Sequence, residues 1–300
     1  MTEDKKEQEK KEVQEKKREL SVRDAIIIGS IIIAASVIAG AFIISSSISG
    51  IKITTTSSTT NQLQSYLQTL QKLPLPNISN IDPVYGNPDN TNVIVFEYSD
   101  YACPFCDEFY VQTFYQGILP NYIENGKIAW VYKVFPLYEI HPYANITSQY
   151  LTCVYEIYGF NTWEELANWS WFNFFTWDGY SSVNDVYNAF NQEAKTLGLN
   201  VSEIDQCVNS MEYYNEIYNS ELNAMNTYGI DATPSFIIAV KTSTINYQQV
   251  QQVENTLNSL RQYGLSYSVF TTPDEKYIMF EFAGALPYSF FNSILQAITQ

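Results

Sequence analysis

The stretch that decides the fold is Val93-Ile-Val-Phe-Glu-Tyr-Ser-Asp-Tyr-Ala-Cys-Pro-Phe-Cys-Asp-Glu-Phe109. It begins with an apolar run typical of a buried strand, and a pattern typical of a helix follows Cys106. A strand that delivers a C-x-x-C pair to the start of a helix is the sequence form of a dithiol redox site. We therefore expect redox chemistry at Cys103 and Cys106.

The composition limits the class of protein. The 300 residues are 46% hydrophobic and include 24 Tyr and 17 Phe, so the chain can bury a sizeable core. Residues 1–24 carry equal numbers of basic and acidic groups, and the net charge of −16 therefore belongs to the remainder. Because such an acidic body repels phosphate, nucleic acid is excluded as an expected partner.

Three segments precede the expected folded domain. Residues 1–24 are rich in Lys and Glu and predict a solvated cytoplasmic tail. Residues 25–45 predict a transmembrane anchor, because Ala25–Ile44 is uncharged and, as a helix, spans roughly 30 Å, the thickness of the bilayer core. A buried core helix or a cleaved signal peptide is the alternative. Residues 46–77 predict a Ser/Thr-rich tether and a short helix over 61–73.

The distribution of Lys and Arg predicts the orientation in the cell membrane. All the basic residues of the tail precede the apolar segment, and Lys52 is the lone one in the twenty residues after it. The N-terminus is therefore expected in the cytoplasm and the remainder outside, in a single-pass topology. The later chain also contains N-x-[ST] sequons, which would make it a glycoprotein if they are used: Asn77, Asn145, Asn168 and Asn200.

The domain expected over 78–300 alternates strands and helices. Four runs are typical of buried strands: Val93–Tyr98, Ile128–Phe135, Ser235–Val240 and Tyr277–Ala283. A helical insertion of about 141–225 separates the second and third runs, and in it Ser202 is expected to cap a helix whose apolar stripe ends at Met211. A second insertion, about 241–276, is expected at the sheet edge, and Pro287 begins the last helix. The order predicts an α/β fold.

The position of the two cysteines predicts different roles for them. At a helix start the first sulfur lies near unpaired backbone N–H groups and the positive end of the helix dipole, which favour the thiolate. Cys103 is therefore expected to be the exposed nucleophile and Cys106 the shielded resolving thiol, and Pro104 suits the first turn. A structural disulfide or half of a zinc site is the alternative. Zinc needs two more ligands, and no second C-x-x-C or Cys/His pair exists, so no metal or cofactor is expected.

A second signature is Asp231-Ala-Thr-Pro-Ser-Phe236, directly before a strand. A proline at a strand start often marks a cis bond. Because Pro234 cannot donate a hydrogen bond, the neighbouring Thr233 backbone stays free to pair with an extended peptide beside the cysteines. An ordinary turn is the alternative.

These motifs together resemble the thioredoxin superfamily, and within it the DsbA-like proteins, over about Ile78–Gln300. The resemblance rests on Glu97 six residues before Cys103, on the C-P-F-C motif, on Thr233-Pro234, on Gly284-Ala-Leu-Pro287 and on the helical insertion. It implies a thioredoxin fold with an inserted helical domain. It also implies an extracytoplasmic protein thiol–disulfide oxidoreductase that forms, reduces or isomerises disulfides in exported proteins, together with a membrane or soluble redox partner.

The resemblance also implies roles for single residues. Cys103 and Cys106 are the catalytic pair, and Glu97 matches a buried acid that exchanges a proton with Cys106. The substrate-binding residues are Pro104, Phe105, Thr233 and Pro234. Cys153 and Cys207 resemble a second disulfide that staples the inserted helices, with two buried free thiols as the alternative.

One departure from the family concerns the dipeptide between the cysteines. The strongly oxidising members carry Pro-His, whereas this chain has Phe105, which supplies no positive or hydrogen-bonding group. Asp100, Asp107 and Glu108 lie close in sequence, and both effects are expected to raise the pKa of Cys103 relative to a Pro-His site. The direction of electron flow therefore stays open. His141 is expected to be a cap or packing residue.

Two functions from other classes remain as alternatives. The first is a non-catalytic peptide-binding chaperone or assembly factor on a thioredoxin fold, in which the C-x-x-C pair is only a structural bridge. The second is a metallochaperone that holds a soft metal with the two thiols, although the chain has no Met-rich or His-rich stretch.

Overall fold

The computed structural model describes residues 56–300. The charged tail, the expected anchor at Ala25–Ile44 and the tether as far as residue 55 lie outside the described residues. Among residues 56–300, no helix is both long and apolar enough to cross a membrane. A compact unit spans Thr56–Gln300, so it begins earlier than the expected start at Ile78.

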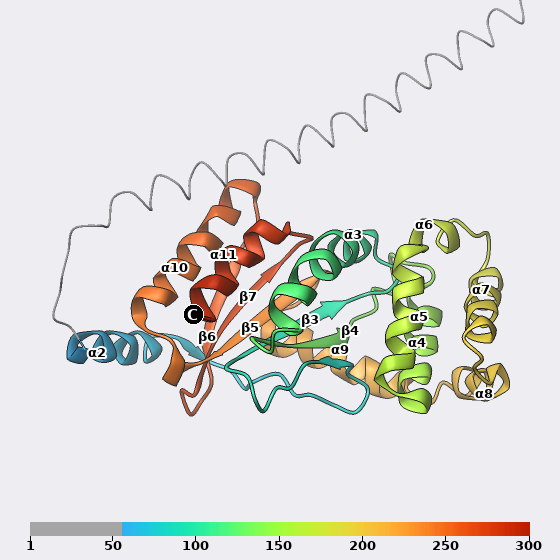
Figure 1. Ribbon diagram of the computed structural model, residues 1–300, viewed down its shortest axis with the longest axis horizontal. Helices are drawn as coiled ribbons and strands as arrows, with labels where there is room; N and C mark the ends of the chain where they lie inside the picture. The colour runs from blue at the N-terminus through green and yellow to red at the C-terminus, as the bar shows by residue number, and fades with distance from the viewer. Residues whose placement is uncertain (1–55) are drawn as a thin grey trace, which may run out of the picture. The chain divides into compact units, whose positions relative to one another are not determined.

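The unit is built on one mixed sheet (Figure 1), whose strand order is β1-β6-β7-β5-β3-β4-β2. The strands are β1 (Gln71–Lys72), β2 (Val84–Tyr85), β3 (Val93–Ser99), β4 (Ala129–Val134), β5 (Ser235–Lys241), β6 (Tyr267–Thr271) and β7 (Tyr277–Ala283). Strand β3 lies at the centre, parallel to β4 and antiparallel to β5. The four predicted strands are β3, β4, β5 and β7, and they form the consecutive centre of the sheet.

The central strands are apolar on both faces because helices cover both faces. Every residue of β3 is buried, and side chains alternate between the two sides along the strand. Val93 and Val95 face one core cluster, whereas Ile94 and Phe96 face the other. A continuous apolar run of this kind is what a strand covered on both faces requires.

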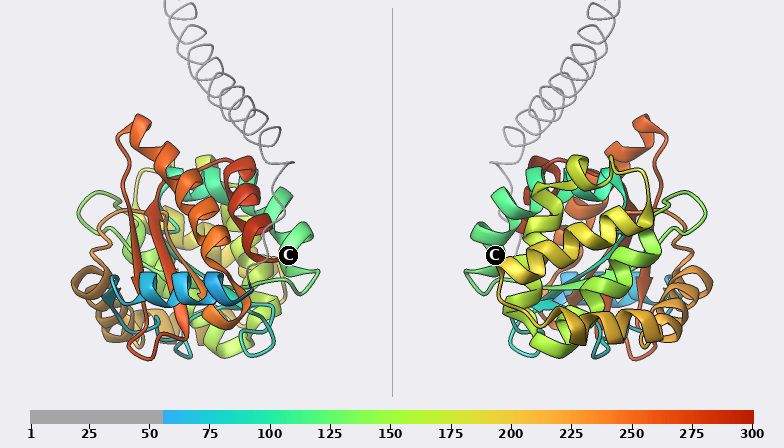
Figure 2. Two further views of the ribbon diagram at one scale, coloured as in Figure 1. Left: turned by 90° about the vertical axis from the view of Figure 1, so that its left-hand side faces the viewer. Right: turned by 90° about the vertical axis from the view of Figure 1, so that its right-hand side faces the viewer.

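Helices from distant parts of the chain cover the first face. They are α2 (Thr56–Leu67), α3 (Pro104–Phe109) with its continuation η1 (Tyr110–Ile123), α10 (Tyr247–Asn258) and α11 (Tyr288–Ile298). Helices α10 and α11 lie side by side (Figure 2). The predicted last helix is confirmed, and its inward residues are all buried: Phe290, Phe291, Ile294 and Leu295. The opposite face is covered by α9 (Tyr214–Tyr228), through Ala224 and Tyr228.

The predicted helical insertion lies between β4 and β5. It contains α4 (Ala144–Tyr158), α5 (Phe160–Phe172), α6 (Phe174–Trp177), α7 (Val183–Thr196), α8 (Val201–Ser210) and α9. A disulfide joins Cys153 of α4 to Cys207 of α8, with 6.0 Å between the Cα atoms. The insertion therefore has a covalent link between helices that are 54 residues apart in sequence.

Two details of the insertion differ from the prediction. Ser202 lies inside α8, whose N-cap position is Asn200, so the predicted Ser202 cap is wrong. Met211 is past the end of α8, in the left-handed region at φ 56°, and its side chain is 40% exposed. The helix has already ended at Ser210, so the apolar stripe does not reach Met211.

The second insertion lies at the sheet edge, as expected. After β5 it forms η2 (Thr242–Thr244), α10, η3 (Ser259–Tyr263) and β6, and β6 pairs with β7. Strand β1 then pairs in parallel with β6, which extends the sheet by a segment from before the expected domain start. The short helix expected over 61–73 is displaced toward the N-terminus and ends at Leu67, because Gln71–Lys72 is drawn into this pairing.

Candidate active site

The turn between β3 and α3 places Cys103 at the start of the helix. Cys103 is the N-cap residue with extended backbone, and Pro104 occupies the first turn, where its missing N–H costs nothing. The carbonyl oxygen of Asp100 accepts the Cys103 N–H at 3.0 Å, and its Oδ1 accepts the Ala102 N–H at 2.8 Å. Asp100 thus holds the backbone that presents the first sulfur.

The two cysteines are free thiols, and both are buried. Cys106 is 0% exposed, as expected of a shielded thiol, but Cys103 is only 2% exposed, so the prediction of an exposed nucleophile is wrong. The residues between them are the exposed ones, with Phe105 at 61%. Cys103 is covered because its sulfur turns inward, toward the carbonyl oxygen of Thr233 at 3.5 Å.

Thr233 belongs to a loop that closes one side of the dithiol. The Thr233-Pro234 peptide bond is cis and lies directly before β5. The carbonyl oxygen of Pro234 accepts the N–H of Gly284 at 2.8 Å, and Gly284 has φ 116°, which a residue with a Cβ rarely adopts. The structure therefore brings Cys103 next to Thr233 and Pro234, although 130 positions separate Cys103 from Thr233 in the sequence.

The environment separates the pKa values of the two thiols. The pKa of Cys103 is lowered to about 6, chiefly by a hydrogen bond from Cys106, with smaller contributions from Thr233 and from the charge of His141, while burial opposes the shift. The pKa of Cys106 is raised well above its usual range by burial and by the neighbouring Cys103. At neutral pH, Cys103 is therefore the thiolate and Cys106 the thiol.

The acidic residues of α3 oppose the Cys103 thiolate less than their number suggests. Burial raises the pKa of Asp107 to about 7, and the charge of Glu108 adds to this shift. Burial also raises the pKa of Glu108. Since a carboxyl with a pKa of about 7 is only partly ionised near neutral pH, the repulsion of the thiolate by Asp107 is reduced.

Glu97 lies two residues before Ser99 on β3, and its side chain is on the same face of the strand. Its side chain is buried, and Oε2 accepts the indole N–H of Trp130 at 2.9 Å. Burial raises its pKa to about 7, against the lowering effects of Trp130 and Ser99. Ser99 also lowers the pKa of Cys106, so the same hydroxyl affects both the acid and the second thiol.

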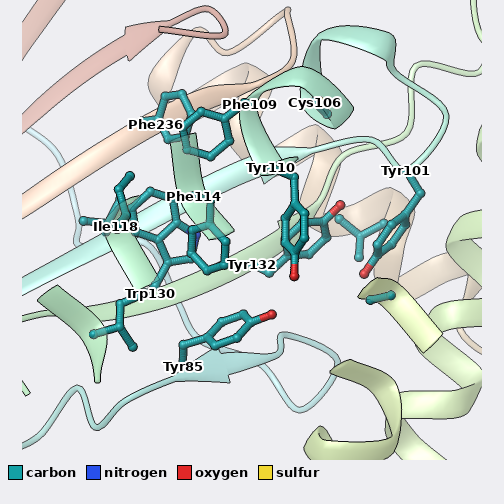
Figure 3. Packing of buried hydrophobic residues seen from close by; sticks show 14 of the residues in the cluster. Tyr85, Tyr101, Cys106, Phe109, Tyr110, Phe114, Ile118, Trp130, Tyr132 and Phe236 are labelled. Carbon is teal, nitrogen blue, oxygen red and sulfur yellow. The ribbon is translucent and has the colours of Figure 1, made fainter. Parts of the chain in front are cut away.

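The cluster around Glu97 is polar but enclosed by aromatic rings. Within the described residues, no hydrogen-bond partner of normal geometry reaches Glu97 Oε1, Ser99 Oγ or Tyr132 Oη. Figure 3 shows Cys106 on α3 and the aromatic core beside it, which includes Trp130 and Tyr132. Uncompensated polar atoms in such a core are costly, and they favour the neutral form of the carboxyl.

His141 is a site residue that reasoning from the sequence missed. It lies 41 positions after Asp100, and its Nδ1 is 2.7 Å from Asp100 Oδ2. Its pKa is raised, first by this hydrogen bond and also by the charge of Cys103. A lone histidine before Pro142 gave no signal of its position, because only the fold places the end of β4 beside the end of β3.

The remaining predicted site residues lie apart from the dithiol. Cys153 and Cys207 form the disulfide within the helical insertion. Among residues 56–300, no group of three or more His, Cys, Asp or Glu side chains could hold a metal ion.

Together, the central strand order, the C-x-x-C pair at the start of α3 and the facing cis-proline define a thioredoxin fold with a DsbA-like helical insertion. Residues 79–258, more than half of the chain, match the family model described as Thioredoxin. The chain belongs to the thioredoxin family.

Solved structures show the same fold. The crystal structure of Wolbachia pipientis alpha-DsbA1 superposes with a TM-score of 0.55 at 20% identity, covering 76% of this chain and 93% of that one. A variant of it with two cysteines replaced by alanine gives the same TM-score and identity, covering 80% and 96%.

A curated relative is similar over a short segment. This Rickettsia typhi protein, provisionally named a protein-disulfide oxidoreductase, is 43% identical over 58 residues. The match covers 19% of this chain and 21% of the relative, so the chain spans about a fifth of the length of that protein.

Proposed function

We propose that the protein is an extracytoplasmic thiol–disulfide oxidoreductase that acts on exported proteins through the Cys103/Cys106 pair. One observation carries the proposal: Cys103, at the start of α3, lies 3.5 Å from the carbonyl of the cis-proline loop, with a second free thiol, Cys106, in the first turn of the same helix. The lowered pKa of Cys103 and the raised pKa of Cys106 agree with this arrangement. A low-pKa thiolate is both the attacking and the leaving sulfur that disulfide exchange needs.

The reaction in the oxidising direction has two exchange steps. A substrate thiolate attacks the sulfur of Cys103, the Cys103–Cys106 bond breaks, and its electron pair goes to Cys106, which takes up a proton. A second substrate thiolate then attacks the substrate sulfur of this mixed disulfide, and Cys103 leaves as a thiolate. The substrate gains one disulfide and loses two electrons to the enzyme dithiol. The reverse sequence reduces a substrate disulfide.

Glu97 is suited to move the proton of Cys106. A thiol with a raised pKa is a poor leaving group unless a proton reaches it, and a carboxyl with a pKa of about 7 can give or take a proton near neutral pH. The route runs past Ser99, which acts on both groups. Trp130 holds one carboxyl oxygen, and the other is left without a partner among residues 56–300.

The cis-proline loop is the proposed binding edge for an extended substrate peptide. The Cys103 sulfur lies 3.5 Å from the carbonyl oxygen of Thr233, and a substrate backbone N–H can donate to this carbonyl when a disulfide joins Cys103 to the substrate. Pro234 closes the loop next to it. The exposed Pro104 and Phe105 offer apolar contact to the residues that flank the substrate cysteine.

The compartment proposed for this reaction is outside the cytoplasm, with the N-terminal segment as a single-pass membrane anchor. The Cys153–Cys207 disulfide supports an oxidising compartment, because structural disulfides persist there and are rare in the cytosol. Glycosylation at Asn168 is disfavoured, since its side chain is half-buried and accepts a hydrogen bond from Tyr110.

The test replaces single cysteines and measures exchange. Cys103→Ser should abolish both insulin reduction and the oxidation of reduced ribonuclease, whereas Cys106→Ser should accumulate a mixed disulfide with substrate at Cys103. Unchanged turnover in Cys103→Ser would refute the proposal and favour a non-catalytic peptide-binding factor. The equilibrium of the pair with glutathione then gives the direction: a strongly reducing value excludes a dedicated oxidase.

A further inference from the structure

A buried carboxylate connects the dithiol turn to the loop after β4. Asp100 is fully buried, and its Oδ1 accepts the Ala102 N–H. Its Oδ2 accepts the Leu137 N–H at 2.8 Å and contacts His141 Nδ1 at 2.7 Å. The backbone N–H of His141 in turn donates to the Leu137 carbonyl at 3.0 Å. Both the ring and the backbone of His141 are thus fixed relative to the Cys103 turn.

This arrangement determines where the imidazole carries its hydrogen. A carboxylate oxygen that already accepts a backbone N–H can only accept again, so Nδ1 must be the donor. A buried carboxylate without a nearby lysine or arginine in contact needs a positive partner, and its contact with His141 is the one ion pair that Asp100 makes within residues 56–300. The pair therefore favours the protonated imidazolium.

The imidazole is linked through Asp100 to the turn that carries the reactive sulfur, because Asp100 also accepts the backbone N–H groups of Ala102 and Cys103. The charge of His141 lowers the pKa of Cys103, and the charge of Cys103 raises the pKa of His141. Phe105, between the cysteines, supplies no such charge. The positive group that the C-x-x-C dipeptide lacks is therefore provided from the loop after β4.

We propose that Asp100 holds His141 as an imidazolium beside Cys103, and that this charge stabilises the Cys103 thiolate in the dithiol state and loses its partner when the Cys103–Cys106 disulfide forms. The proposal rests on the proposed function, since it concerns the same redox pair. His141 is the charge partner of the reacting sulfur, and Asp100 is a positioning residue that acts through His141.

Other titratable groups near Asp100 and His141 also affect how the charge of His141 depends on pH. Burial raises the pKa of Asp178, in the loop after α6, and the charge of His141 opposes this shift; Asp178 in turn raises the pKa of His141. On α9, burial and the charge of Asp100 raise the pKa of Glu221 to about 7. Burial raises the pKa of Tyr138, and the charges of Glu221 and Asp100 add to this shift. Cys103 is the one of these groups whose charge is removed by oxidation.

The coupling makes the proton on His141 depend on the redox state. Interaction between two titrating sites is reciprocal. The charge of His141 stabilises the Cys103 thiolate by the same free energy by which the thiolate stabilises the protonated form of His141. When oxidation removes the thiolate, the affinity of His141 for its proton falls. At a pH between the titration midpoints of His141 in the oxidised and the reduced protein, formation of the disulfide therefore releases a proton from the imidazole in addition to those of the thiols.

The chain allows this to be measured directly, because His141 is its only histidine. The protein is prepared without a polyhistidine tag, and the single imidazole resonance is titrated by NMR in the reduced and the oxidised form. We expect a higher midpoint in the reduced form, by up to about one pH unit, because the thiolate is an opposite charge that favours the imidazolium. Cys103→Ser, which never carries the thiolate, should give the midpoint of the oxidised form. Equal midpoints in both redox states would overturn the proposal.

A variant tests the same coupling from the sulfur side. His141→Gln keeps a donor for Asp100 but removes the charge, and the thiolate absorbance near 240 nm should then titrate about one pH unit higher. A shift of that size from about 6 weakens the reduced form about fivefold at pH 7 in the glutathione equilibrium, making the pair less oxidising. His141→Lys, which restores a charge, should recover part of the shift.

These readouts separate the two proposals. An unchanged thiolate titration in a folded His141→Gln protein would overturn the role of His141 while leaving disulfide exchange by Cys103 intact. Loss of exchange in every assay, together with a redox-dependent His141 midpoint, would instead refute the proposed function.

Discussion

Replacing Glu97 by glutamine tests the central electrostatic claim about the site. The carboxyl is buried, and its pKa rises from an ordinary 4.5 to about 7 because of burial. A carboxyl with a raised pKa binds its proton more tightly in the folded than in the unfolded chain. Its contribution to stability is therefore fully present below about pH 4.5 and is lost as the pH rises through 7.

The size of this effect follows from the two pKa values. Between pH 5 and pH 8, the linkage relation predicts that Glu97 lowers the free energy of unfolding by about 2.5 kcal/mol. Glutamine has nearly the same shape and can still accept the Trp130 N–H, but it does not titrate. The variant should therefore gain about 2.5 kcal/mol over the wild type between these pH values, since all other groups titrate alike in both proteins.

The assay is urea unfolding of the oxidised proteins at pH 5, 6, 7 and 8. The oxidised form is used because Cys103 and Cys106 then do not titrate. Parallel curves of unfolding free energy against pH for the wild type and Glu97→Gln would refute the argument, because they would show that the carboxyl is not desolvated. The same variant should also slow disulfide exchange if Glu97 supplies the proton of Cys106.

Three further predictions concern the disulfide, the core and the nucleophile. Replacing Cys153 and Cys207 together by alanine opens a 54-residue loop and should lower the free energy of unfolding by about 4 kcal/mol, measured in urea, with exchange activity retained. Gly117→Ala places a Cβ against the Tyr288 ring and should cost about 1–3 kcal/mol in the same assay; an unchanged midpoint would show that η1 and α11 are looser than described. Alkylation of Cys103 by iodoacetamide should accelerate with pH about a midpoint near 6, and a midpoint near 9 would contradict the lowered pKa.

The centre of the fold could be predicted because local pattern and tertiary requirement agree there. The β3 run is apolar at every position but Glu97 and its end, and it is covered on both faces. Helix α11 follows Pro287 with inward residues at helical spacing, as predicted. In these segments the residues that favour a strand or a helix are also the residues that the core needs.

The elements that were missed depend on pairing between distant segments. Gln71–Lys72 has no strand pattern of its own and is extended because it pairs with Phe270–Thr271. Val84–Tyr85 likewise forms a strand by pairing with β4. Such short edge strands carry almost no periodic signal, since two residues cannot show an alternation.

The site residues also divide into those that a local motif reveals and those that only the fold brings together. The C-x-x-C pair and Thr233-Pro234 could be found because each is a local motif. The contact of His141 with Asp100 could not, because it depends on where the β4 loop passes the end of β3. The burial of Cys103 was also missed, since a helix start is usually open and only the inward turn toward Thr233 covers the sulfur.

The covered position of Cys103 has a consequence for its chemical lifetime. Oxidation of a cysteine by peroxide to sulfinic and sulfonic acids increases with thiolate character and with access of the oxidant. Cys103 has high thiolate character, but an oxidant has little access to it, because the residue is only 2% exposed. Small oxidants in solution therefore rarely reach the thiolate. A docked polypeptide that displaces the Cys103–Thr233 contact can react with it. Burial of Cys103 thereby slows its irreversible oxidation relative to disulfide exchange, while the sulfur stays nucleophilic.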